Sequence, residues 1–234
     1  NEIDIKNFPF VTSKNLTLDL SGGKKVDVWA ARISYVGESG WEIYFNNDKD
    51  DGLALYDSLL EVGVVPVGIE TYANSRRLEK SFRLQGADLE TEYTAIEAAI
   101  QRPLVKEADF HGKAAHLSHR ENEPCAILCT MTLDDLNVSG VPRYPVGISP
   151  IIDPATGEVP IDRKGRRSYT TGMSYCPSIK KFVVMGYLPN NIAEVGKSLS
   201  MEYFNENGDG IYPMTVQIVG KGSLYDPKNQ RVRA

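Results

Sequence analysis

The hydrophobic pattern of the chain changes near residue 120, and this change separates two parts of different structural class. In the first part, stretches of β-branched, aromatic and alternating apolar residues indicate strands, and apolar residues at helical spacing indicate helices. Strands and helices that follow one another in this way predict an α+β layer around one sheet. The predictions for this part are an extended lead-in at 1–25 with a turn at 21–23, strands at 26–35 and 41–45, and helices after Asp50 or Asp51, at 68–80 and at 109–119.

The second part of the chain contains only short predicted strands, which turns rich in Pro and Gly separate. Many short strands separated by such turns predict a small barrel or a sandwich. The segment "ENEP" at 121–124 marks the boundary, so two domains are expected, 1–120 and 121–234. The predicted strands are 125–133, 182–188, 199–204 and 214–219, and two of the predicted turns are 153–157 and 207–210.

Charge and hydropathy argue against several functional classes. The chain has 26 Lys and Arg against 31 Asp and Glu, a formal net charge of −5, which disfavours a protein that holds nucleic acid through its phosphates. The sequence has no apolar run long enough to span a membrane and no secretory signal, so no membrane partner is expected. Only 3 cysteines occur, which predicts a reducing compartment and a cytoplasmic location.

Four motifs occur in a fixed order along the chain: "YVGESGWEIY", "SRRLEKSFRLQGADL", "VKEADFHGKAAHL" and "TTGMSYCPSIKKFVVMGYLP". In this order they resemble the aminomethyltransferase family, which includes the T-protein of the glycine cleavage system. The closing segment "YPMTVQIVGKGSLYDPKNQRVRA" and the octet "RRLEKSFR" are similar to the sarcosine and dimethylglycine dehydrogenase branch of that family. The resemblance covers nearly the whole chain.

The resemblance implies a fold, a reaction and partners. Its fold is a folate-binding α+β region, here partial, followed by a small C-terminal β-barrel. Its reaction passes a one-carbon unit from an amine-derived adduct to tetrahydrofolate, so a methylated small-molecule donor is expected as a partner. In the dehydrogenase branch a separate flavin domain or subunit first oxidises an N-methyl group. FAD would belong only to that domain, because this chain has no Gly-x-Gly-x-x-Gly.

Glu42 is the candidate cofactor-binding residue. If Trp41, Ile43 and Phe45 face the core, Glu42 points to the opposite side of the strand. A pterin edge presents adjacent N–H donors, and a carboxylate can accept two of them in parallel. The resemblance places the pterin-binding glutamate of the family at Glu42 and suggests that Tyr35 lines the same pocket. The alternatives are an ordinary solvent-facing glutamate and a half-buried tyrosine that needs no ligand.

Other charged residues are expected to have structural roles. Glu38 is predicted to be a solvated turn residue. Gly165-Arg166-Arg167 is predicted to be an exposed turn, which could alternatively contact a polyglutamate tail or a partner. Arg77 is predicted to pair with neighbours in its helix or in a strand. The folate-binding arginine of the T-protein would fall at position 73, where this chain has Ala73.

No metal site and no catalytic residue is expected in this chain. His111, His116 and His119 lack the Cys or carboxylate partners that would complete a zinc shell. The catalytic aspartate of the family would lie in a portion that precedes anything matching here, and the chain starts at Asn1 instead of Met. We therefore expect the chain to be the C-terminal part of a longer transferase, with little or no activity alone.

The sequence leaves three functions open. The leading one is the C-terminal part of a tetrahydrofolate-dependent one-carbon transferase linked to the oxidation of an N-methyl amine. The alternative is a non-catalytic folate-binding or assembly module on the same scaffold. A third reading stays within the transferase class, with a sulfonium or an aryl ether as the methyl donor.

Overall fold

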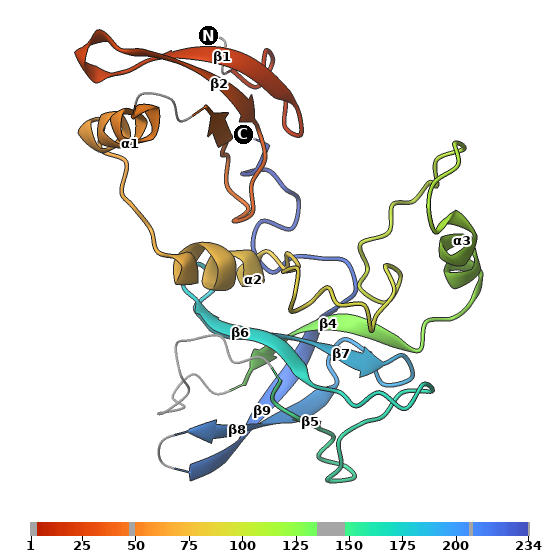
Figure 1. Ribbon diagram of the computed structural model, residues 1–234. Helices are drawn as coiled ribbons and strands as arrows, with labels where there is room; N and C mark the ends of the chain where they lie inside the picture. Colours follow the sequence, from red (N-terminus) through yellow and green to blue (C-terminus); the bar gives the residue numbers. More distant parts are fainter. Residues whose placement is uncertain (1–3, 47–49, 135–147, 206–207, 234) are drawn as a thin grey trace. The chain divides into compact units, whose positions relative to one another are not determined.

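The computed structural model describes residues 4–46, 50–134, 148–205 and 208–233 (Figure 1). The chain forms two compact units. Unit 1 comprises Asn1–Tyr72 and Asp226–Ala234, and unit 2 comprises Ala73–Tyr225. These units are defined by contacts within the chain, and the domain division at residue 120 stays a prediction.

Unit 1 is built on a three-stranded antiparallel sheet in the order β1-β2-β3. Its strands are β1 (Ser13–Asp19), β2 (Lys25–Ala31) and β3 (Glu42–Phe45), and the short 3-10 helix η1 (Ser21–Gly23) joins the first two. Helix α1 (Asp51–Glu61) follows the sheet. Alternate residues of β2 and Leu55 of α1 form the apolar core of this unit, as the strand and helix periods require.

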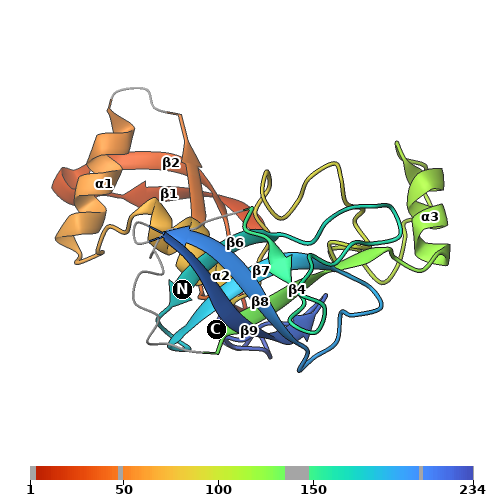
Figure 2. The same cartoon turned by 90° about the horizontal axis from the view of Figure 1, so that it is seen from below.

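Unit 2 contains a six-stranded antiparallel sheet within the described residues, in the order β5-β8-β9-β4-β7-β6. A bridge between Pro150 and Tyr169 and a hydrogen bond from the Thr170 N–H to the Ser149 carbonyl, 2.9 Å long, join the two edges of this sheet. The sheet therefore curls on itself, as Figures 1 and 2 show, and the predicted C-terminal barrel-like architecture is confirmed. The strands are β4 (Ala126–Leu133), β5 (Ile151–Ile152), β6 (Thr170–Cys176), β7 (Lys181–Pro189), β8 (Ser198–Asn205) and β9 (Gly208–Val219).

The two faces of the curled sheet bury two different cores. Side chains from all six strands, including Met131 and Val184, fill the inside. The neighbouring residues of the same strands, such as Val183 and Tyr187, point outward and pack against Leu78. Leu78 belongs to α2 (Arg77–Glu79), so this short helix covers the outer face of β6 and β7.

The helices of the second and third motifs differ from the prediction in type and in bounds. The predicted helix at 68–80 is a π-helix, η2 (Glu70–Arg76), followed by the single turn α2. The predicted helix at 109–119 is found later, as α3 (Lys113–Glu121).

The strand predictions were incomplete. Residues 1–25 were predicted as a lead-in, but they include β1, which pairs along its whole length with β2. The predicted strand at 26–35 ends at Ala31, and β6 was not predicted. The turn at 153–157 is confirmed by hydrogen bonds from the Thr156 and Gly157 N–H groups to the Asp153 carbonyl. Residue 207 of the predicted turn at 207–210 lies outside the described residues, and 208–210 belong to β9 instead of a turn.

Candidate functional site

Strand β3 places Glu42 on the face of the unit 1 sheet that is opposite to the core. Ile43 and Phe45 pack against the core, as predicted, and Glu42 and Tyr44 alternate with them. Trp41 was predicted to face the core, which is wrong. It precedes the strand, is 38% exposed and lies under the Arg32 guanidinium, whose carbon is 5.1 Å from the centroid of the ring.

The Glu42 carboxylate is held from one side. The Tyr44 hydroxyl donates a hydrogen bond to Glu42 Oε2, and this bond raises the pKa of the Tyr44 phenol because the carboxylate disfavours a neighbouring tyrosinate. Glu42 Oε1 accepts no hydrogen bond from any residue that the structure describes. One edge of the carboxylate is therefore open to a ligand donor.

Aromatic rings surround this carboxylate within unit 1. The centroid of Tyr44 lies 5.0 Å from that of Trp29, which is its pairing partner on β2. The ring of Tyr35 lies 5.6 Å from that of Tyr72. Burial raises the pKa of Tyr72, and the charge of Glu42 raises it further, so Tyr72 is close enough to sense that carboxylate. Tyr35 thus contacts Tyr72, which in turn senses the charge of Glu42.

A shallow groove of about 690 Å³ lies on the same face of the sheet. It runs across all three strands, and Trp29 and Tyr44 line it from the outer face. Neither Glu42 nor Tyr35 is among its lining residues. The groove offers flat aromatic surface together with polar groups, a combination that suits a planar heterocycle. The remaining lining residues are Asn15, Leu16, Thr17, Asp27, Val28, Phe45 and Asn46.

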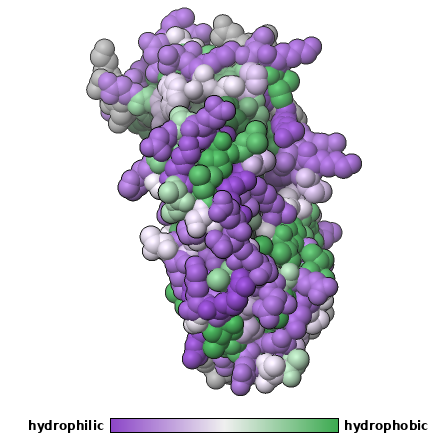
Figure 3. Space-filling view, turned by 90° about the vertical axis from the view of Figure 1, so that its right-hand side faces the viewer, coloured by the Kyte–Doolittle hydropathy of each residue, from purple (hydrophilic) through white to green (hydrophobic). Residues whose placement is uncertain are grey.

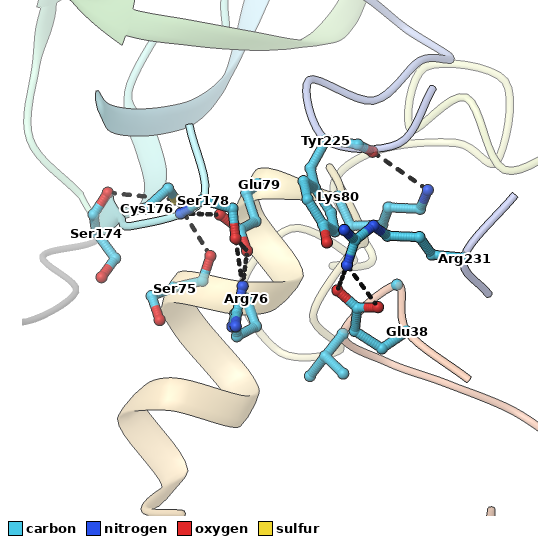
Figure 4. Close-up of polar contacts among 12 residues, drawn as sticks. Glu38, Ser75, Arg76, Glu79, Lys80, Ser174, Cys176, Ser178, Tyr225 and Arg231 are labelled. Carbon is cyan, nitrogen blue, oxygen red and sulfur yellow. Dashed lines mark hydrogen bonds and ion pairs between the residues drawn. The ribbon is translucent and has the colours of Figure 1, made fainter. Parts of the chain in front are cut away.

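The carboxylate of Glu38, the other acidic residue of the first motif, is not simply solvated as predicted. It pairs with Arg231 of the C-terminal segment at 3.4 Å, and both residues belong to unit 1 (Figure 4). The Glu38 side chain is 35% exposed. Glu38 therefore ties the turn before β3 to the end of the chain.

The second motif builds a buried polar cluster in unit 2 (Figure 4). Glu79 is fully buried and accepts hydrogen bonds from Arg76 Nη1 at 2.7 Å and from the Ser178 hydroxyl at 3.0 Å. The neighbouring Lys80 is also buried and donates to the Tyr225 carbonyl at 3.2 Å. These contacts fix α2 against the loop between β6 and β7, which is a structural role.

Arg77 has a structural ion pair, but its partner Asp88 lies in a turn, whereas a partner in its helix or in a strand was predicted. Arg77 Nη1 contacts the Asp88 carboxylate, and both side chains are essentially inaccessible to solvent. The Thr171 hydroxyl donates to the other oxygen of Asp88. Thr171 reaches Asp88 from a β-bulge, since the register of β6 against β7 shifts between Thr170 and Gly172.

Arg166 was predicted in an exposed turn, which is wrong. Its side chain is 9% exposed and forms ion pairs with Glu97 and Asp162. Its guanidinium carbon also lies 4.3 Å from the centroid of the Tyr93 ring, and Tyr93 stacks on Tyr187 with a centroid separation of 3.5 Å. No local pattern in the sequence signals this cluster, because its members come from segments up to 94 residues apart.

An apolar groove of about 910 Å³ follows the segment from Ala95 to His116 in unit 2. Its lining includes the exposed side chains of Ile100 and Leu104, which are 47% and 87% accessible. Figure 3 shows the side of the molecule that carries α3, where hydrophobic side chains form separate patches on a largely hydrophilic surface. This groove offers apolar surface more than specific polar chemistry.

Within the part of the chain that the structure describes, no three His, Cys, Asp or Glu side chains come together in a way that could hold a metal ion. Cys129 is buried in the barrel, and burial raises the pKa of its thiol to about 12, which makes it a poor nucleophile. Among the described residues, no helix is both long and apolar enough to cross a membrane.

Comparisons with known proteins give related sequences and a related fold. Residues 1–107 match the family described as "GCVT N-terminal domain". The chain is 32% identical over 218 residues to "Dimethylglycine dehydrogenase, mitochondrial" of Rattus norvegicus, an alignment that covers 89% of this chain and 22% of the relative. It is 29% identical over 188 residues to the "Aminomethyltransferase" of Koribacter versatilis (strain Ellin345), which covers 77% of this chain and 45% of the relative.

Among solved structures, the chain matches glycine cleavage system aminomethyltransferase T from Bartonella henselae with a TM-score of 0.67 and 22% sequence identity. This match covers 89% of the chain and 51% of that protein, and it shows a shared fold. The chain therefore spans between about a fifth and a half of the length of these relatives. The relatives are of the two kinds that the sequence motifs predicted, and the one from rat is named as mitochondrial. The cytoplasmic location stays a prediction.

Proposed function

Because this chain belongs to the aminomethyltransferase family, which includes the glycine cleavage T-protein, we propose that it is part of a tetrahydrofolate-dependent one-carbon transferase. Its named relatives include dimethylglycine dehydrogenases, which supports a methylated amine as the source of the one-carbon unit. The oxidation of that amine would belong to a flavin domain or subunit outside this chain. The domain boundary near residue 120 is part of the same proposal.

The observation that carries the proposal is the open edge of the Glu42 carboxylate. Glu42 Oε2 is held by the Tyr44 hydroxyl, and Oε1 has no donor among the described residues. A carboxylate has about four lone-pair sites, so one bond from Tyr44 leaves capacity for two parallel N–H donors of a pterin. The bond to Tyr44 also limits the rotation of the carboxylate, which lowers the ordering cost of binding.

The aromatic rings near Glu42 support the same ligand. A reduced pterin is a flat heterocycle whose face needs an apolar or aromatic surface while its edge needs hydrogen-bond partners. The rings of Tyr35 and Tyr72 lie against each other in a tilted arrangement, and the pKa of Tyr72 responds to the Glu42 charge, so these two rings would supply such a surface. We assign Glu42 to the pterin edge and Tyr35 to the wall of the site. We assign no catalytic residue to this chain.

A binding titration of the full-length protein with tetrahydrofolate tests the proposal. Glu42→Gln keeps the shape of the side chain but replaces one acceptor oxygen by a donor and removes the charge. A hydrogen bond to a charged group contributes on the order of 1.5–3 kcal/mol. We therefore expect the Kd for tetrahydrofolate to rise roughly 10- to 150-fold.

Glu61→Gln is the matched control, because Glu61 is an exposed carboxylate at the end of α1 in the same unit. It should bind tetrahydrofolate as the unchanged protein does. Equal affinity of the Glu42→Gln protein and the unchanged protein would reduce Glu42 to an ordinary strand residue and remove the basis of the proposed site.

The alternative function, a non-catalytic folate-binding or assembly module, uses the same binding site. It therefore predicts the same loss of affinity in Glu42→Gln. The two functions separate in a turnover assay of the full-length protein with tetrahydrofolate and an N-methyl amine. Formation of methylene-tetrahydrofolate supports the transferase, and tight binding without turnover supports the module. We expect the chain alone to show little or no turnover, since one-carbon transfer requires both reactants to be held in one geometry.

A further inference from the structure

Unit 2 carries the apolar groove of about 910 Å³ that follows the segment from Ala95 to His116, and the proposed function makes no use of it. Leu104 and Ile100 line this groove and are 87% and 47% exposed. Contiguous exposed apolar surface of this kind marks sites of interaction. We propose that the groove binds a polypeptide segment of a partner protein, whose apolar side chains fill the groove and whose carboxylates lie at its rim.

Helix α3 borders the groove through His116, and none of its residues is buried. Its apolar residue Leu117 is 40% exposed. Polar contacts hold the helix, because Arg120 Nη1 and Nη2 donate to the Arg102 and Pro103 carbonyls at 2.8 Å. Figures 1 and 2 show α3 at the side of the curled sheet. Most helices in proteins owe their stability to a packed apolar face, so a partner that covers the groove would supply packing that unit 2 does not.

Gln101 is the polar residue of the groove that points to a polypeptide. Its side-chain Oε1 is buried and accepts no hydrogen bond from any residue that the structure describes. A buried acceptor without a donor is costly, so an occupant that brings a donor is favoured. A polypeptide carries a backbone N–H at every residue except proline, whereas the hydrocarbon tail of a lipid carries no donor. The groove therefore fits a polypeptide segment better than a membrane surface.

The charge of the segment around the groove selects an acidic partner. Residues 100–120 contain four Lys and Arg against two Asp and Glu, although the whole chain has a net charge of −5. Arg102 and Lys106 are exposed lining residues, and Glu107 is the one carboxylate among the described lining residues. Carboxylates of a partner are therefore attracted to this rim, and a basic segment is repelled.

The same charges argue against a second copy of this chain as the occupant. In a symmetric dimer the same surface of both copies forms the interface. A dimer through this groove would therefore bring two basic rims together, and their like charges would repel each other. A different polypeptide with acidic residues meets no such repulsion.

The test is a selection of binding peptides by the whole chain from a displayed library of random short peptides. We expect the selected peptides to share apolar residues flanked by Asp or Glu, and to bind Leu104→Ser about tenfold or more weakly than the unchanged chain. Val195→Ser is the control, because Val195 is a 64% exposed apolar residue of unit 2 that does not line the groove. No selected peptide, a basic consensus, or equal binding to Leu104→Ser and the unchanged chain would overturn the proposal.

Two further variants test the acceptor and the charge separately. Gln101→Leu should weaken binding of the selected peptide about fivefold or more without lowering the urea midpoint of unfolding, because it removes a buried acceptor that has no donor. Arg102→Gln should weaken binding and reduce its dependence on salt, and Lys181→Gln, an exposed lysine of unit 2 outside the groove, should do neither. Unchanged peptide affinity in both Gln101→Leu and Arg102→Gln would refute the site.

The other occupants are tested with phosphatidylserine vesicles and by sedimentation of the chain alone. Vesicle binding that Leu104→Ser abolishes would assign the groove to a membrane surface, and self-association that Leu104→Ser abolishes would assign it to a second copy. Either result would overturn a polypeptide partner. None of these measurements involves tetrahydrofolate or Glu42, so this proposal and the proposed function can fail separately.

Discussion

Glu42 and Tyr44 stand two residues apart on the outer face of β3 and act on each other directly. The hydrogen bond to Glu42, with a smaller contribution from burial, holds the pKa of Tyr44 above its ordinary value of 10.0. Glu42→Gln removes the negative charge, so the pKa of Tyr44 should fall toward 10.0. An NMR pH titration of ring-labelled tyrosine measures this shift, and Glu61→Gln is the control. An unchanged Tyr44 pKa in Glu42→Gln would mean that the two side chains do not interact in solution.

Protonation of Glu97, which belongs to the buried charge cluster of unit 2, is expected to destabilise the protein at acidic pH. Burial alone would raise its pKa, but hydrogen bonds from Arg166 and Thr94 and the Arg166 charge lower it from 4.5 to about 2. Because the folded-state pKa is depressed, the stabilisation is present above pH 4.5 and is lost as the pH falls toward 2. At 1.36 kcal/mol per pKa unit, this contribution is about 3 kcal/mol.

Urea unfolding between pH 2 and 7 checks this prediction. The unchanged protein should lose stability more steeply between pH 4.5 and 2 than Glu97→Gln, which cannot bind the proton. Glu123→Gln is the control, since Glu123 forms an exposed ion pair and is 62% accessible. Identical slopes for the unchanged protein and Glu97→Gln would contradict the assignment.

The sequence predicted individual residues well where a local period decides their orientation. The alternation in β3 was enough to place Glu42 opposite Ile43 and Phe45. It failed for Trp41, because a residue just before a strand is not bound by the strand period. The partners of Arg77 and Arg166 could not be predicted, since Asp88 and Glu97 reach them through tertiary packing that leaves no spacing signal.

At the scale of elements, a helix or strand was predicted correctly from the sequence where its apolar residues recur with a clear period. Helix α1 and strands β4, β7 and β8 carry clear apolar periods and were predicted close to their observed bounds. Strand β9 was predicted from residue 214 only, although it begins at Gly208. Strand β1 was missed because its side chains are exposed or only half-buried, so its apolar pattern is weak. Strand β6 was missed because Gly172 and Ser174 interrupt its two threonines and Tyr175, so that no continuous run of β-branched and aromatic residues marks it.

The closure of the curled sheet depends on a glycine in β7. A Cβ on residue 186 would lie 2.6 Å from the Tyr169 carbonyl oxygen and 2.8 Å from Ile151 Cδ1. Tyr169 is the residue that bridges to Pro150 and joins the sheet edges, so its backbone has little freedom to move. Gly186→Ala should therefore lower the free energy of unfolding by about 1–3 kcal/mol.

Chemical denaturation measures this effect, with Gly68→Ala as the control. A Cβ at residue 68 would meet no atom within 4 Å, and no positive φ constrains the position. Gly68→Ala should be neutral or slightly stabilising, because alanine reduces the freedom of the unfolded chain. If both variants had the same free energy of unfolding, the close approach of the Tyr169 carbonyl to Gly186 would not contribute to stability.

At the scale of the whole molecule, the shared fold tells which architecture the chain adopts, and the position of the ligand residues tells where a ligand would bind. The α+β and barrel architecture followed from periodicity, and the match to a solved aminomethyltransferase supports it. The ligand residue proposed for this chain, Glu42, lies in unit 1, whereas the curled sheet forms unit 2. Tetrahydrofolate is therefore expected to act on unit 1.

Hydrogen–deuterium exchange of the full-length protein can locate this effect. Tetrahydrofolate should slow exchange in Glu42–Phe45 and in the paired residues of β2, because a ligand that binds only the folded state stabilises the elements it contacts. Exchange at 84–92 of unit 2 should stay unchanged. Glu42→Gln should abolish the effect of tetrahydrofolate on β3, and Glu61→Gln should keep it. Protection of 84–92 by tetrahydrofolate, with none at β3, would move the folate site away from Glu42 and contradict its assignment.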